Sequence, residues 1–162
     1  MKKLLLSITI LLLTLSFAFA EDESYIENES KLMAISLGPE WNMNSRENFA
    51  AGAALGFDFN LGSSYAVGIN MTASSNFSGI AVIEPAAMFR WYFLGKNHNG
   101  LFAQAEAGTF LIIEDSEVIP MFLGGLRAGF RLPLGSMFFV EPFGRVGYPF
   151  MFGFGAMAGI KF

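Results

Sequence analysis

The stretch FAAGAALGFDFNL, residues 49–61, alternates between large apolar and small or polar side chains. Such a period of two is typical of a β-strand, because successive side chains point to opposite faces. The stretch exceeds the roughly 5–6 residues of an ordinary globular strand. It reaches the roughly 9–11 residues that a tilted strand needs to cross a bilayer. One face carries Phe49, Ala51, Ala53, Leu55, Phe57, Phe59 and Leu61, and the other carries Ala50, Gly52, Ala54, Gly56, Asp58 and Asn60.

The same alternation recurs along the chain and predicts seven further strands. Short turns or loops separate them, such as Gly62-Ser63-Ser64, GKNHNG at 95–100, EDSEVIP at 114–120 and Gly135-Ser136. An even number of strands with short connections predicts an all-β fold, an eight-stranded antiparallel up-and-down barrel. The seven strands are expected at about residues 32–38, 65–72, 80–93, 101–113, 122–134, 137–148 and 152–162.

The choice of residues on the two faces indicates which face is outside. A soluble barrel would put its aromatic residues inward and charged residues outward, but here the face opposite the aromatics is mostly Gly, Ala and Ser. Small residues suit the narrow lumen of an eight-stranded barrel, so we expect the large residues to face lipid. An aromatic girdle is predicted beside the turns, formed by Tyr65, Trp91, Tyr92 and Phe93.

The N-terminus has the layout of a secretory signal peptide. Lys2-Lys3 precede an apolar run over 4–15, and Ala18 and Ala20 form an A-x-A cleavage site. The run is too short for a transmembrane helix. We therefore expect cleavage after residue 20, a flexible acidic lead over 21–31 and a barrel domain over 32–162. The chain has no cysteine, which excludes both a disulfide framework and a lipidated N-terminal cysteine.

Composition narrows the function classes. The chain is 53% hydrophobic and only 15% charged, with 19 Phe and 18 Gly, whereas soluble domains carry about 25% charged residues. Without Lys2 and Lys3, eight basic residues face fourteen acidic ones. This acidic balance argues against nucleic acid as a partner.

The sequence resembles the small outer-membrane β-barrels of the OmpA/OmpX and OmpW type. The resemblance rests on the signal peptide, the eight-strand rhythm, IEPAAMFRWYF at 83–93, GLRAGFRLPLG at 125–135 and the terminal Phe162. It implies periplasmic termini, a monomeric protein of the bacterial outer membrane, and outer-membrane lipids and the barrel-assembly machinery as partners. It also implies an assembly signal on the last strand, formed by Phe154, Ala156, Ala158, Ile160 and Phe162.

Charged residues on the small-residue face would lie inside the barrel. Counted upward from the periplasmic turns, Asp58, Arg90, Arg131 and Glu141 fall at one height and predict a lower layer of two acids and two arginines. Charges in a narrow lumen must be paired, because an unpaired buried charge costs several kcal/mol. Two interpretations stay open, a structural plug and a gate whose pairs exchange. A looser group, expected higher in the lumen, consists of Glu84, Glu106, Arg127 and Arg145.

Three prolines fall within the predicted strands, at Pro85, Pro133 and Pro142. Proline removes a donor from the ladder and is normally confined to edges or bulges. A closed barrel has no edges, so we expect β-bulges at these sites. The alternative is a lateral opening through which an apolar solute reaches the bilayer, as is thought for OmpW-like barrels.

No residue pattern indicates an enzyme, a cofactor or a metal site. The single histidine, His98, falls in a turn at the predicted periplasmic end and is expected to be solvated. A hydrolase needs a nucleophile, a base and an orienting group within reach of one another, and none is indicated. The functions left open are a structural envelope barrel, a narrow channel for small or apolar solutes, and a surface-recognition barrel acting through short loops.

Overall fold

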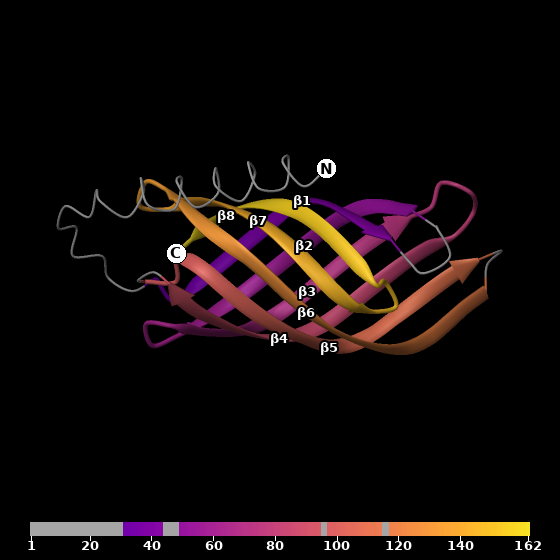
Figure 1. Cartoon of the computed structure of the whole chain (residues 1–162), viewed down its shortest axis with the longest axis horizontal. Helices are drawn as coiled ribbons and strands as arrows, with labels where there is room; N and C mark the ends of the chain where they lie inside the picture. The colour runs from indigo at the N-terminus through magenta and orange to yellow at the C-terminus, as the bar shows by residue number, and fades with distance from the viewer. Residues whose placement is uncertain (1–30, 44–48, 95–96, 115–116) are drawn as a thin grey trace, which may run out of the picture.

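The computed structural model describes residues 31–43, 49–94, 97–114 and 117–162, which form one closed barrel. Each strand pairs antiparallel with its neighbours in the chain, and β1 pairs with β8 (Figure 1). The predicted eight-stranded antiparallel barrel is therefore confirmed. The expected signal peptide at 1–20 and acidic lead lie outside the described residues, except for Lys31. The strands are β1 (Met33–Met43), β2 (Phe49–Leu61), β3 (Tyr65–Ser75), β4 (Ala81–Leu94), β5 (Gly100–Glu114), β6 (Glu117–Leu134), β7 (Phe138–Tyr148) and β8 (Phe152–Lys161).

The barrel closes where the start of β1 meets the end of β8. The backbone N–H of Met33 donates to the carbonyl of Phe162, and the N–H of Phe162 donates back to Met33, both at 2.9 Å. We call this the terminal end; it also carries the β2–β3, β4–β5 and β6–β7 turns. The opposite end, with the β1–β2, β3–β4, β5–β6 and β7–β8 connections, is the loop end. In the described part of the chain, no helix is long and apolar enough to span a membrane.

The exterior of the barrel is apolar and the interior is polar, as the residue pattern predicts. Ile69, Trp91 and Leu126 are among the large apolar side chains exposed on the outside. Glu, Asp, Asn and Arg side chains are buried within. This inside-out arrangement is that of a transmembrane barrel, since hydrocarbon accepts apolar side chains and no unpaired polar groups.

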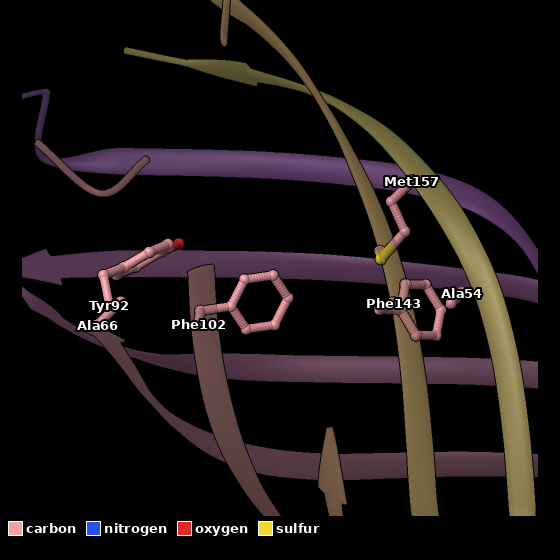
Figure 2. Packing of buried hydrophobic residues seen from close by; sticks show 6 residues of the cluster. All are labelled: Ala54, Ala66, Tyr92, Phe102, Phe143 and Met157. Atoms are coloured by element: carbon pink, nitrogen blue, oxygen red, sulfur yellow. The ribbon is translucent and has the colours of Figure 1, made fainter. Parts of the chain in front are cut away.

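The expectation that all large residues face outward is wrong in part. Figure 2 shows the rings of Tyr92, Phe102 and Phe143 inside the barrel, where they belong to one buried cluster. Tyr92, expected in the outer girdle, is buried, because it shares the inward face of β4 with Arg90 two residues earlier. Phe110 and Phe139 are buried as well. The interior therefore holds aromatic rings as well as charges.

Strand β1 is longer than the alternation predicted, because Pro39 does not end it. The pairing with β2 continues without a break from Met33↔Phe59 to Met43↔Phe49. The extension places Glu40 and Asn42 inside the lumen and the Trp41 side chain outside, stacked on Phe154.

The expected bulges at Pro85, Pro133 and Pro142 are absent from the described pairings. The registers of β4 with β3 and of β7 with β8 run unbroken through Pro85 and Pro142, and Pro133 pairs directly with Phe139. Instead, each proline leaves a gap in one of its two ladders. Pro85 has no paired position in the β4–β5 ladder, and Pro142 has none in the β6–β7 ladder. The register on the two sides of each gap is the same. Because proline has no N–H, it interrupts one ladder locally, without the extra residue that a β-bulge would insert. The register shift of the β4–β5 ladder falls elsewhere, between Tyr92 and Leu94.

Glycine faces each of these gaps. A Cβ atom at Gly108 would lie 2.1 Å from the carbonyl oxygen of Pro85, and one at Gly129 would lie 2.5 Å from that of Pro142. At Gly129 it would also lie 2.7 Å from the Phe102 ring. Only a residue without a side chain fits at these positions.

We expect Gly129→Ala to destabilise the barrel by about 1–3 kcal/mol, the usual cost of overpacking. Gly144→Ala is the matched control, because the nearest atom to its added Cβ, the carbonyl oxygen of Gly153, is 3.8 Å away. Urea unfolding of both variants in lipid vesicles, followed by tryptophan fluorescence, measures the difference. Equal midpoints for the two variants would contradict the close approach at Gly129.

Candidate functional site

A closed ring of four charges crosses the lumen toward the terminal end. Arg90 contacts Asp58 at 3.2 Å and Glu141 at 3.0 Å, while Arg131 contacts Asp58 at 2.5 Å and Glu141 at 2.6 Å. Acids and arginines therefore alternate around the ring, and each group has two partners of opposite sign. We call Asp58, Arg90, Arg131 and Glu141 the lower ring. The structure thus brings together the four residues that the sequence predicted at one height.

The strands hold this ring from four positions on the wall. Asp58 is on β2, Arg90 on β4, Arg131 on β6 and Glu141 on β7. All four side chains are almost completely removed from solvent. Planar guanidinium groups suit such a site because their N–H donors reach two carboxylates at once.

An aromatic ring lies against the guanidinium group of each arginine in the lower ring. The guanidinium carbon of Arg90 lies 4.2 Å from the centre of the Phe102 ring, and that of Arg131 lies 4.1 Å from the Phe139 ring. The face of an aromatic ring attracts a cation, and more strongly where water is excluded. Tyr92 adds a polar contact, since Arg90 donates to its hydroxyl at 3.0 Å.

A second set of charges lies toward the loop end. Arg145 contacts Glu40 and Glu84, each at 2.7 Å, while Arg127 contacts Glu40 at 3.2 Å and Glu106 at 2.8 Å. Arg127 also lies over the Phe143 ring, at 4.0 Å from its centre. We call Glu40, Glu84, Glu106, Arg127 and Arg145 the upper cluster. It contains all four residues of the looser group predicted from the sequence, and one residue, Glu40, that the sequence analysis missed.

Glu40 is the centre of the upper cluster. One carboxylate oxygen accepts from Arg145 and from the amide of Asn42, and the other accepts from Arg127 and the hydroxyl of Thr72. Four donors thus satisfy a carboxylate that is fully buried. The signal was present in the sequence, because Glu40 continues the small-residue face of Ser36 and Gly38. The predicted strand stopped at residue 38 and therefore left Glu40 out.

Gln104 connects the two charged sets. Its side-chain oxygen accepts from Arg90 at 2.6 Å, and its amide donates to Glu106 at 2.6 Å. Asn70 donates to the same Glu106 oxygen at 2.8 Å. The lower ring and the upper cluster are therefore one continuous network of buried polar side chains.

Residues 97–99 of the β4–β5 turn lie at the terminal end of the barrel. His98 is buried there, which corrects the expectation of a solvated side chain. Its ring nitrogen Nε2 lies 3.1 Å from the carbonyl oxygen of Tyr65, and because a carbonyl only accepts, Nε2 carries the proton. The ring packs edge-on against Tyr92 at 5.5 Å, and Lys161 donates to the neighbouring Asn99 at 2.7 Å.

The described residues contain no group of three or more His, Cys, Asp or Glu side chains arranged to hold a metal ion. The predicted assembly signal on β8 lies on the outside of the barrel, where Phe154, Ile160 and Phe162 are exposed. Its role in assembly stays a prediction.

The fold is shared with solved structures whose sequences are distant. Neisserial surface protein A (NspA) superposes with a TM-score of 0.58 at 9% identity, over 80% of this chain and 96% of the other. The N-terminal β-barrel domain of Pseudomonas aeruginosa OprF gives 0.55 at 13%, over 82% and 98%. A designed transmembrane β-barrel gives 0.53 at 10%, over 83% and 99%. These likenesses show a common eight-stranded barrel fold. No protein-family model and no curated protein matches the sequence.

We expect Arg131→Ala to lower the stability of the barrel by about 3–5 kcal/mol, because it removes one partner from both Asp58 and Glu141 in a buried site. Urea unfolding in vesicles measures the loss. The control is a double-mutant cycle with Asp58→Asn, in which the second substitution should cost less in the Arg131→Ala background than alone. Additive losses would show that the two side chains do not interact.

We expect a pH-dependent contribution from His98. Burial lowers the pKa of His98 below its ordinary value of 6.5, only partly opposed by its bond to Tyr65, and the nearby Arg131 lowers the pKa further. The unfolded chain therefore binds the proton more readily, so the His98 contribution to stability is complete above about pH 6.5 and decreases as the pH falls below it. The decrease stops once the pH is below the folded pKa.

The measurement is the free energy of unfolding between pH 5 and pH 8. One group changes it by at most about 1.4 kcal/mol per pH unit. His98→Phe keeps a ring in the turn without a titrating group, and the difference between the two proteins isolates the histidine. Parallel curves for the two proteins would contradict a buried neutral His98.

Proposed function

We propose that the protein is an integral outer-membrane β-barrel with a structural role in the envelope, and that its charged lumen is a plug. The observation that carries the plug is the continuous network from Glu40 to Arg131. Its pairs connect β1, β2, β4, β5, β6 and β7 across the lumen. A steady pathway for ions would require several of these buried pairs to separate together, each at a cost of several kcal/mol.

The membrane placement is supported by the apolar exterior, the closed hydrogen-bonded wall and the fold shared with a designed transmembrane barrel. Over the height at which the barrel is closed, no strand edge exposes unpaired backbone N–H or C=O groups to hydrocarbon. We propose the outer membrane because the sequence also has the layout of a secretory signal peptide, which directs export. A catalytic role is not part of the proposal.

The plug predicts that the purified barrel, reconstituted in planar bilayers, conducts no steady ionic current. A control with Arg127→Ala and Arg145→Ala together removes both cations of the upper cluster and should raise the frequency of current steps. Folding of both proteins is checked by the heat-dependent shift in gel mobility that is typical of such barrels. Regular current steps in the unaltered protein would instead support the narrow channel.

We further propose that the barrel-assembly machinery reads the exterior face of β8. Deletion of Phe162 should reduce insertion into the outer membrane far more than refolding into synthetic vesicles, because only the first requires the machinery. Phe138→Ala, an exposed aromatic at the same end on β7, is the control. If both changes affect insertion equally, Phe162 is a lipid contact and no signal.

A further inference from the structure

At the loop end, the β5–β6 hairpin extends beyond β7 (Figure 1). Its ladder continues to the pair Glu114↔Glu117, whereas β6 pairs with β7 only up to Gly124↔Tyr148. The segment Glu117–Leu123 therefore has β5 on one side and, among the described residues, no strand on the other. On the other side of the hairpin, β4 pairs with β5 up to Ala81↔Ile113, so this wall has one open edge, along β6.

Both faces of this wall are apolar. On the inner face, which continues the lumen side, the ladder pairs Phe110 with Met121 and Ile112 with Ile119. The lower part is buried in a cluster of Phe110, Leu123 and Ala86, but farther out Ile119 is 46% and Met121 is 40% exposed. On the outer face, Val118 is 57% and Phe122 is 70% exposed.

An apolar inner face is unexpected at this position. Antiparallel sheets with one solvated face normally show polar side chains there. Apart from the tip, where Glu114 pairs with Glu117, the strands of the wall offer little but apolar side chains. A molecule that covers Ile119 and Met121 would remove this surface from water.

Pro120 indicates what kind of molecule that is. The β5–β6 ladder runs through Leu111↔Pro120 without a gap, whereas the ladders beside Pro85 and Pro142 are interrupted. The nitrogen of Pro120 therefore does not face β5. It lies on the open edge of β6. Proline on an edge strand prevents another strand from pairing with it. The partner must therefore be one that needs no backbone hydrogen bonds.

We propose that the inner face of the hairpin, at Phe110, Ile112, Ile119 and Met121, binds the acyl chain of an outer-leaflet lipid. The proposal rests on the membrane placement given above. The outer face of the same hairpin continues the lipid-facing surface, and the open edge of β6 lies between the two faces, so a chain can pass around it from the bilayer. Glu114 and Glu117 at the tip favour a headgroup with an ammonium over an anionic one.

The test uses the full barrel refolded in vesicles that contain phosphatidylethanolamine with a photoactivatable diazirine at the end of one acyl chain. After illumination, mass spectrometry locates the adducts. We expect adducts on the exterior residues Leu126 and Val146, and additional adducts on Ile119 and Met121 of the inner face. The double variant Ile119→Asp and Met121→Asp should lose the inner adducts and keep the exterior ones.

Val118→Asp, on the outer face of the same hairpin, is the matched control and should keep the inner adducts. Gel mobility with and without heating verifies folding, and Ile119→Asn is a milder variant if the double one fails to fold. Exterior adducts without inner ones would overturn the acyl site and leave the membrane placement intact. Absence of exterior adducts would overturn the membrane placement itself.

Discussion

The pairing of buried arginines with carboxylates is the constraint on which the interior depends. Each guanidinium in the lower ring meets two carboxylates, and Glu40 collects four donors in the upper cluster. Such charges are tolerated in a narrow lumen only when they are paired and hydrogen-bonded. The strand registers must therefore bring groups from different parts of the chain to the same height, and each pair in turn fixes the strands that carry it.

Space inside the barrel explains the remaining residue choices. Phe102, Phe139 and Phe143 lie under arginine side chains, where they fill volume and still attract the cation. Glycines such as Gly108 and Gly129 stand where a neighbouring carbonyl approaches too closely for a Cβ atom. The same close approach occurs at Gly52 and Gly68, where the ladder is unbroken and contains no proline.

The two ends of the barrel differ in physical character. At the terminal end, the buried His98 contacts the backbone of Tyr65, and hydrogen bonds join Met33 to Phe162. The loop end is uneven, with an apolar hairpin on β5 and β6 and a short connection between β7 and β8.

The sequence by itself determined the fold. The period of two shows which residues share a face of each strand, and the small residues opposite the large ones show which face lies inside. It also placed Asp58, Arg90, Arg131 and Glu141 at one height, since residues counted from short turns keep their level. Only the tertiary structure decided the partners of the upper cluster and the roles of Glu40, Pro39 and His98. The reason is physical: whether a proline ends a strand, or a histidine in a turn is buried, depends on contacts with strands far away in the chain.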